Sequence, residues 1–124
     1  MDYIFVGIGG IFGALSRYSL SRWVGQRWKG YFPVATFAIN ITGSFTMGLL
    51  FVLFSNAGPE LSNLKNLTTT GFLGAYTTYS TFSFEIISLV QDGEIITAVK
   101  YFLASLGTGL LSAYAGILLA RWVL

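Results

Sequence analysis

The sequence of 124 residues contains no cysteine and no histidine, and only 10% of its residues are charged. Disulfide bridges, thiolate chemistry, zinc sites with imidazole ligands and histidine-based acid–base catalysis are therefore excluded. The formal net charge of +2 is too small to suggest nucleic-acid binding. Because an enzyme would have almost no reactive groups to work with, we expect a protein that is not an enzyme.

Apolar residues, in contrast, make up 54% of the chain, and the mean hydropathy is +0.69. A soluble domain of this length could not bury so much apolar surface. Four segments reach the length of about 20 apolar residues that a membrane-spanning helix needs. We expect a single domain over residues 1–124 with spans at about 3–23, 33–54, 67–90 and 95–122. The sequence thus predicts an all-α protein with four transmembrane helices in a lipid bilayer.

Glycine occurs in all four predicted spans. The hydrophobic effect does not hold helices together in lipid, so close backbone approach over small residues must contribute instead. Tight helix packing is therefore the expected role of most of these glycines. Four short helices can hardly enclose a polar path by themselves, which favours an oligomer.

The fourth predicted span carries a row of hydroxyl groups. At about 100° per residue, Tyr101, Ser105, Thr108 and Ser112 fall within a stripe about 60° wide. A single hydroxyl in a span usually bonds to its own helix or to a neighbouring one. Four on one face are consistent either with such contacts or with the lining of a polar path.

Two further polar residues lie inside the first two spans. Asn40 in the second span offers two amide donors that suit an anion, although an intramembrane asparagine is most often a contact between helices. Arg17 in the first span is expected to extend to the membrane interface. The alternative for Arg17 is a cation at the bottom of an aqueous vestibule, where it would attract anions.

The stretch GFLGAYTTYSTFSFE, residues 71–85, is unusual for a membrane span. Its glycine, serine and threonine residues disfavour a helix. A non-helical turn at membrane depth is tolerated only where it is buried in protein or lines a wet cavity, and its free carbonyl groups can bind a cation. Tyr79 and Phe82 are three residues apart and share a helix face, and their positively polarised ring edges favour a small anion.

This stretch closely resembles the third-span signature of the Fluc (CrcB) family of fluoride channels, G-F-x-G-x-x-T-T-F-S-T-F-S. GGIFGALSRY in the first span places Arg17 at the family's arginine, and TFAINITG in the second places Asn40 at the family's asparagine. The resemblance covers the whole chain in length, span count and motif order. It implies a fluoride-selective channel in the bacterial inner membrane that relieves fluoride toxicity by passive efflux.

The resemblance also implies an antiparallel dual-topology dimer, in which a second copy of the chain, or a paired homologue, is inserted in the opposite orientation. A structural sodium ion at the dimer centre would be held by the backbone carbonyls of Gly74 and Thr77. Two pores per dimer would bind fluoride, with Arg17 in the vestibule and Glu85 just beyond the pore. The implied pore residues are Asn40, Tyr79, Ser80, Thr81, Phe82, Tyr101 and Ser105, with Thr108 and Ser112 possible replacements for a hydroxyl that some members carry at the position of Gly109.

A small proton-coupled multidrug exporter is the main alternative, since it also has four spans and antiparallel dimers. Proton coupling needs a carboxylate deep in the membrane, and only Glu85 among the acidic residues could lie within a span. A non-transporting assembly subunit would explain the packing but not polar clusters in three spans. Basic residues slightly favour a cytoplasmic first loop, which leaves the orientation open.

Overall fold

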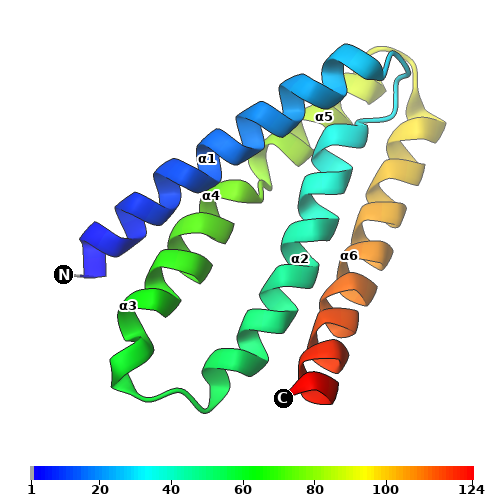
Figure 1. The fold of residues 1–124 in the computed structure, drawn as a ribbon. Helices are drawn as coiled ribbons and strands as arrows, with labels where there is room; N and C mark the ends of the chain where they lie inside the picture. Colours follow the sequence, from blue (N-terminus) through cyan, green and yellow to red (C-terminus); the bar gives the residue numbers. More distant parts are fainter. Residues whose placement is uncertain (1) are drawn as a thin grey trace.

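The computed structural model describes residues 2–124, and the regular secondary structure in that range is helical. Its main helices are α1 (Asp2–Arg27), α2 (Val34–Ser55), α5 (Ser80–Gln91) and α6 (Ile95–Val123). Between α2 and α5 the chain forms η1 (Pro59–Leu61), α3 (Ser62–Lys65), η2 (Asn66–Leu73) and α4 (Gly74–Tyr76). In Figure 1, α3, η2 and α4 follow one another as a single rod, and α5 continues it after a bend. The predicted all-helical fold with an interrupted third helix is confirmed.

Three of the helices, α1, α2 and α6, are long and apolar enough to cross a membrane. They contain 26, 22 and 29 residues. The remaining pass of the chain is divided into two shorter helical parts by residues 77–79, which are not helical. Since neither part alone has the length of a span, the two parts must share one crossing.

Proline and glycine, two residue types that are common at helix ends, occur in the turns between the helices. Pro33 precedes the first residue of α2, where its missing N–H and fixed φ do no harm. Gly93 follows α5 with a φ of +79°, and the Glu94 N–H bonds to the Leu89 carbonyl at 2.8 Å. This left-handed glycine closes α5 and turns the chain into α6.

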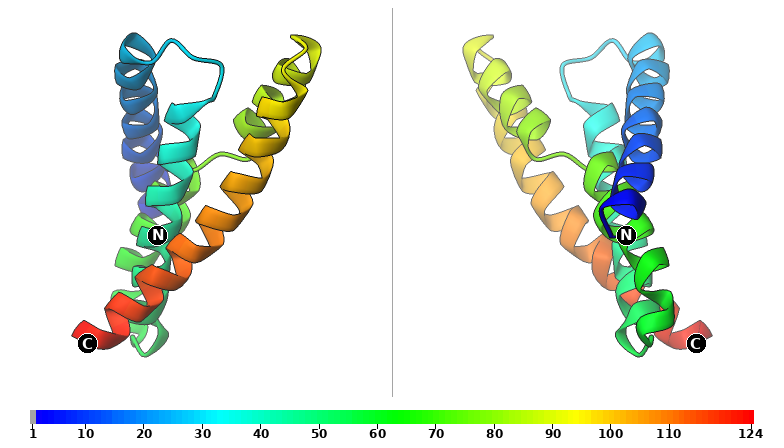
Figure 2. Two further views of the ribbon diagram at one scale, coloured as in Figure 1. Left: turned by 90° about the vertical axis from the view of Figure 1, so that its right-hand side faces the viewer. Right: turned by 90° about the vertical axis from the view of Figure 1, so that its left-hand side faces the viewer.

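The four passes form a V when seen from the side (Figure 2). The C-terminal half of α6 packs against α2, whereas α5 and the N-terminal half of α6 lean away from α1. The break at residues 77–79 is the point at which the third pass changes direction and crosses from one arm to the other (Figure 2).

Glycines allow helices to approach closely both where α2 meets α6 and where α1 meets the third pass. A β-carbon at Gly116 of α6 would collide with the Phe45 carbonyl of α2, and one at Gly48 would collide with the Ala113 carbonyl. Glycine contacts of the same kind join α1 to η2, where Gly9 lies against the Leu67 carbonyl. The predicted role of glycine in helix packing holds at these positions, because only a residue without a side chain fits there.

Most large apolar side chains face outward. Fully buried large side chains among the described residues are Ile39, Leu73 and Tyr101. In contrast, Phe12 on α1 and Leu110 on α6 are 60% and 67% exposed. Such an apolar exterior is the pattern expected of helices that face lipid or another membrane protein, and it is incompatible with a monomer in water.

Candidate functional site

The third pass is interrupted between α4 and α5. Thr77 is extended, with φ −80° and ψ 158°, although its N–H still bonds to the Leu73 carbonyl at 3.0 Å. The chain resumes as α5 at Ser80, and the Thr78 hydroxyl accepts a hydrogen bond from the Thr81 N–H at 3.2 Å. This bond satisfies one of the backbone donors that a helix start leaves free.

Two carbonyl groups at the break have no hydrogen-bond partner among the described residues. Within residues 2–124, no hydrogen bond reaches the carbonyl oxygen of Gly74 or of Thr77. The described residues also contain no cluster of three acidic, cysteine or histidine side chains. Backbone oxygens are therefore the groups that the break offers to a hard cation such as sodium.

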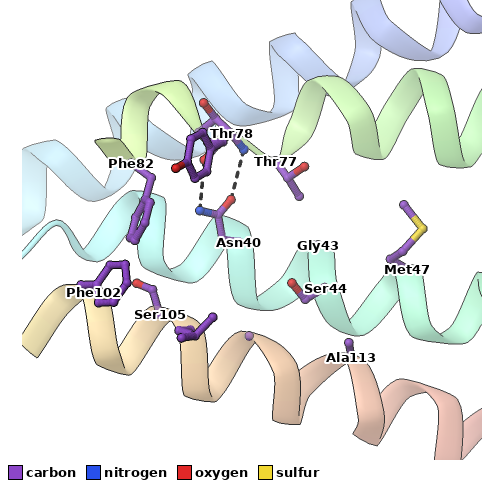
Figure 3. A pocket seen from close by; sticks show the side chains of 13 residues that line it. Asn40, Gly43, Ser44, Met47, Thr77, Thr78, Phe82, Phe102, Ser105 and Ala113 are labelled. Atoms are coloured by element: carbon purple, nitrogen blue, oxygen red, sulfur yellow. Dashed lines mark hydrogen bonds between the residues drawn. The ribbon is translucent and has the colours of Figure 1, made fainter. Parts of the chain in front are cut away.

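Asn40 of α2 holds the break through both ends of its side-chain amide. Its Oδ1 accepts a hydrogen bond from the Thr78 N–H at 3.1 Å, and its Nδ2 donates to the Thr78 carbonyl at 3.3 Å (Figure 3). The amide thus replaces the backbone hydrogen-bond partners that the N–H and carbonyl of Thr78 would have in a continuous helix. One of its two N–H donors stays available for another acceptor.

A second contact between α2 and the third pass lies two residues earlier in the chain, at Tyr76. The hydroxyl groups of Tyr76 and Thr42 are 2.9 Å apart, and the Thr42 hydroxyl also lies 2.8 Å from the Ala38 carbonyl. Since the Thr42 proton points to Ala38, the Tyr76 hydroxyl donates to Thr42. Between these contacts, a β-carbon at Gly43 would collide with the Thr77 side chain. Three consecutive residues, the last residue of α4 and the first two of the break, are therefore fixed by α2.

A groove of about 510 Å³ runs along α2, the break and α6 (Figure 3). Its walls are mostly apolar, with a few polar groups that face the same space. The polar side chains that line it are Asn40, Ser44, Thr77, Thr78, Tyr79 and Ser105. A mostly apolar groove with a few directed donors is the usual form of a site for a small ligand.

Aromatic rings form the end of this groove nearest the break. Tyr79 is 81% exposed, and its ring centroid lies 6.3 Å from that of Phe82. Phe82 in turn meets Tyr101 edge to face at 5.0 Å and Phe102 at 6.4 Å. The Phe82 ring is therefore fixed on two sides, whereas the Tyr79 ring lies free on the surface of the single chain.

Tyr101 and Glu85 are brought together behind the aromatic rings. The Tyr101 hydroxyl donates to Glu85 Oε1 at 3.2 Å, and the Tyr101 side chain is fully buried. Neither residue lines the groove. The pair joins α5 to α6 in the outer part of the V.

The other hydroxyls of α6 divide into two groups. Ser105 lines the groove, and its Oγ is buried without a partner among the described residues. Thr108 donates to the Ala104 carbonyl of its own helix, and Ser112 donates to the Ile41 carbonyl of α2 at 2.8 Å. The stripe predicted from the sequence therefore contributes one free hydroxyl to the groove, and two of its members bond to backbone carbonyls.

Arg17 lies outside the groove, in a separate cavity beside the break. It lines a cavity of about 240 Å³ between α1, α2 and the break, together with the hydroxyl residues Tyr18, Ser21, Thr36, Thr78 and Thr81. Thr78 contacts both the groove and this cavity, so the two spaces adjoin at the break. Ser80 is exposed beside them, with its Oγ 3.5 Å from the Thr78 hydroxyl.

Two parts of the site were not predicted from the sequence. Thr78 is the partner of Asn40, and Tyr76 is bonded to Thr42. The sequence feature that could have pointed to the contact of Thr78 was the pair Thr77-Thr78, which follows Gly71 and Gly74. No sequence signal assigns the second, because the contact joins residues 34 positions apart on different helices.

Comparison with known proteins places these features in a family. The family model described as "CrcB-like protein, Camphor Resistance (CrcB)" matches residues 4–117. The chain is 44% identical over 120 residues to a fluoride-specific ion channel FluC of Moorella thermoacetica, covering 97% of both chains. It is 43% identical over 122 residues to the fluoride-specific ion channel FluC of Acidobacterium capsulatum, covering 98% of this chain and 97% of the relative. A relative with the same description in Stutzerimonas stutzeri is 41% identical over 117 residues, or 94% of each chain.

Both the family match and the relatives extend over nearly the whole chain, including the break and the groove. The relatives are bacterial proteins named as channels and not as enzymes. The chain therefore belongs to the CrcB-like family of multi-pass membrane proteins.

Proposed function

We propose that this protein is a fluoride-selective channel through which fluoride leaves a bacterial cell passively. The observation that carries the proposal is the near full-length similarity to proteins named fluoride-specific ion channels. The groove supports it, because it combines an amide, hydroxyl groups and ring edges without a full positive charge. Weak donors of this kind can replace water around a small anion without trapping it.

The pore would follow the groove past the break. Asn40 would supply its remaining N–H, Phe82 a fixed ring edge and Ser105 an unpaired hydroxyl. Arg17 would attract anions into its cavity, which adjoins the groove at Thr78. The residues proposed to line the path of the ion are Asn40, Tyr79, Phe82 and Ser105. Ser80 and Thr81 would flank it at the break, and Tyr101 with its partner Glu85 would support the Phe82 ring from behind. We assign Thr108 and Ser112 to helix packing, since their hydroxyls are already bonded to carbonyls.

We further propose that two copies of the chain associate in opposite orientations, as one antiparallel dimer over residues 1–124 of each copy. Tyr79 and Gly74 are exposed residues at or next to the break, in the middle of the third pass. Polar backbone at that depth must be covered by protein or water, because lipid offers it no hydrogen bond. A second copy would cover the exposed break with its own break. The partner could instead be a paired homologue, and a test with the purified chain alone distinguishes these two cases.

A sodium ion at the centre of this dimer fits the carbonyl groups of the break. Gly74 and Thr77 each present an oxygen that no described residue occupies, and two copies would present four. When bound, the ion would neutralise the carbonyl dipoles and hold the two breaks together. A binding site made of carbonyls requires no carboxylate, which agrees with the side chains around the break.

Fluoride efflux from liposomes that contain only this purified chain tests the proposal. We expect rapid efflux of fluoride, very little efflux of chloride, and no dependence on a proton gradient. Equal release of the two anions would refute selectivity. Fluoride release that occurs only with a pH gradient would favour a proton-coupled exporter. If the chain alone releases no fluoride but regains release when a homologue is co-expressed, the active form is a heterodimer and not a homodimer.

A further inference from the structure

Ser44 of α2 faces the groove with a hydroxyl group that no contact explains. It lies one helical turn after Asn40 on the same face of α2, and Figure 3 shows both residues beside the groove. Within residues 2–124 its Oγ takes part in no hydrogen bond. The neighbouring threonines behave differently, since Thr42 donates to the Ala38 carbonyl and Thr46 to the Thr42 carbonyl, each at 2.8 Å.

A serine inside a helix usually donates its hydroxyl to the carbonyl four residues earlier. Ser44 would reach the Asn40 carbonyl in that way, and it does not. A free donor at membrane depth is costly unless water or an ion accepts its hydrogen bond. The open space in front of the hydroxyl is the groove itself, so the acceptor of Ser44 must lie there.

The opposite wall of the groove lacks a donor at the same level. Ser105 of α6 has a free hydroxyl, but the lining residues that follow it at intervals of one turn are Gly109 and Ala113. A β-carbon at Gly109 would lie 3.9 Å from Ser44 Oγ, so the two residues lie next to each other where α6 and α2 border the groove. The wall of α6 is therefore without a hydroxyl where the wall of α2 has one.

Close packing does not account for a serine at this position. The tight contact between α2 and α6 is made at Gly48 and Gly116, where an added β-carbon would strike backbone atoms. At Gly109 the distance to Ser44 Oγ is that of an ordinary van der Waals contact. A small side chain at position 109 can thus be accommodated, and Ser44 is not needed to make room.

We infer that Ser44 binds the permeating anion, at a step between Ser105 and the end of the groove near Met47 where α6 offers no donor. This assignment rests on the proposed fluoride channel. A fluoride ion that leaves Ser105 would otherwise enter an apolar stretch formed by Gly109, Ala113 and Met47. The hydroxyl of Ser44 on α2 donates a hydrogen bond to the ion within that stretch, where α6 has no hydroxyl to do so. The distance that the ion must cross without a hydrogen-bond donor is therefore shorter.

Fluoride efflux from liposomes separates this role from a structural one. The variants are Ser44→Ala, Gly109→Ser and the double variant, with Ser55→Ala as the matched control. Ser55 lies on the same helix outside the groove, and its hydroxyl already donates to the Val52 carbonyl at 2.7 Å. All proteins are compared at equal incorporation, with their oligomeric state measured by size-exclusion chromatography.

We expect Ser44→Ala to lower the fluoride flux about tenfold, equivalent to about 1.4 kcal/mol in the barrier. Gly109→Ser in the Ser44→Ala background restores the flux to within about threefold of the original protein, because it returns a hydroxyl from the other wall. Ser55→Ala conducts normally. Fluoride flux in Ser44→Ala equal to that of the unmodified protein overturns the role of Ser44, as does a loss that Gly109→Ser fails to rescue. Absence of fluoride flux in the unmodified protein overturns the proposed function itself.

Discussion

The two hydrogen bonds between Asn40 and Thr78 can be tested by removing the amide. Asn40→Ala deletes a bond of 3.1 Å to the Thr78 N–H and one of 3.3 Å to the Thr78 carbonyl. Each net hydrogen bond contributes about 0.5–1.5 kcal/mol, so we expect a loss of about 1–3 kcal/mol in the free energy of unfolding. The half-buried Thr78 backbone gains no other partner from the described residues, which places the expected loss in the upper part of that range.

Asn40→Asp separates anchoring from anion binding. The aspartate keeps an acceptor for the Thr78 N–H, but an ionised carboxylate cannot donate to the Thr78 carbonyl. It also brings a negative charge to the groove, where a low dielectric strengthens repulsion of fluoride. We expect Asn40→Asp to lose less stability than Asn40→Ala and yet to lower fluoride flux by more than tenfold.

The assay combines unfolding of the purified protein by a denaturing detergent with fluoride efflux from liposomes. Asn63→Ala is the control, since Asn63 is exposed and its side chain makes no hydrogen bond within the described part of the chain. An unfolding curve of Asn40→Ala that coincides with the curve of Asn63→Ala would refute the anchoring role. Normal flux in Asn40→Asp would leave Asn40 with a purely structural role.

Tyr76→Phe removes the donor to the Thr42 hydroxyl and should cost about 0.5–1.5 kcal/mol in stability. Thr42→Val should cost less in the Tyr76→Phe background than in the original protein, because the shared bond is already lost; additive losses in unfolding experiments would show that the two hydroxyls do not interact. Gly116→Ala should separate α2 from α6 and lower the thermal unfolding midpoint. Gly107→Ala on the same helix is the control, because no described atom lies within 4 Å of the added carbon. Equal unfolding midpoints of the two variants would contradict the close contact at Gly116. Phe82→Ile should reduce single-channel fluoride current at least tenfold, because isoleucine fills similar space without a polarised ring edge; undiminished current would move the pore away from the ring.

The sequence by itself determined the class of the protein. Apolar segments of span length predict membrane helices because the bilayer core has a fixed thickness, and the helices α1, α2 and α6 agree with that prediction. The break was also predictable, since glycine, serine and threonine at residues 71–81 favour other backbone conformations than a helix. The family followed from short motifs in three spans, and the comparisons confirmed it.

The position of each polar group, in contrast, was decided only by the tertiary structure. Helical periodicity placed Ser105, Thr108 and Ser112 on one stripe, but it could not show that a neighbouring carbonyl lies within reach of Ser112. It likewise gave no reason to separate Ser44 from Thr42, although one faces the groove and the other bonds to Ala38 and Tyr76. The physical reason is that a hydroxyl in a membrane helix bonds to an acceptor within its reach or stays free where it faces an open groove. Which acceptor is within reach depends on helices that are far apart in the sequence and packed together by glycine contacts.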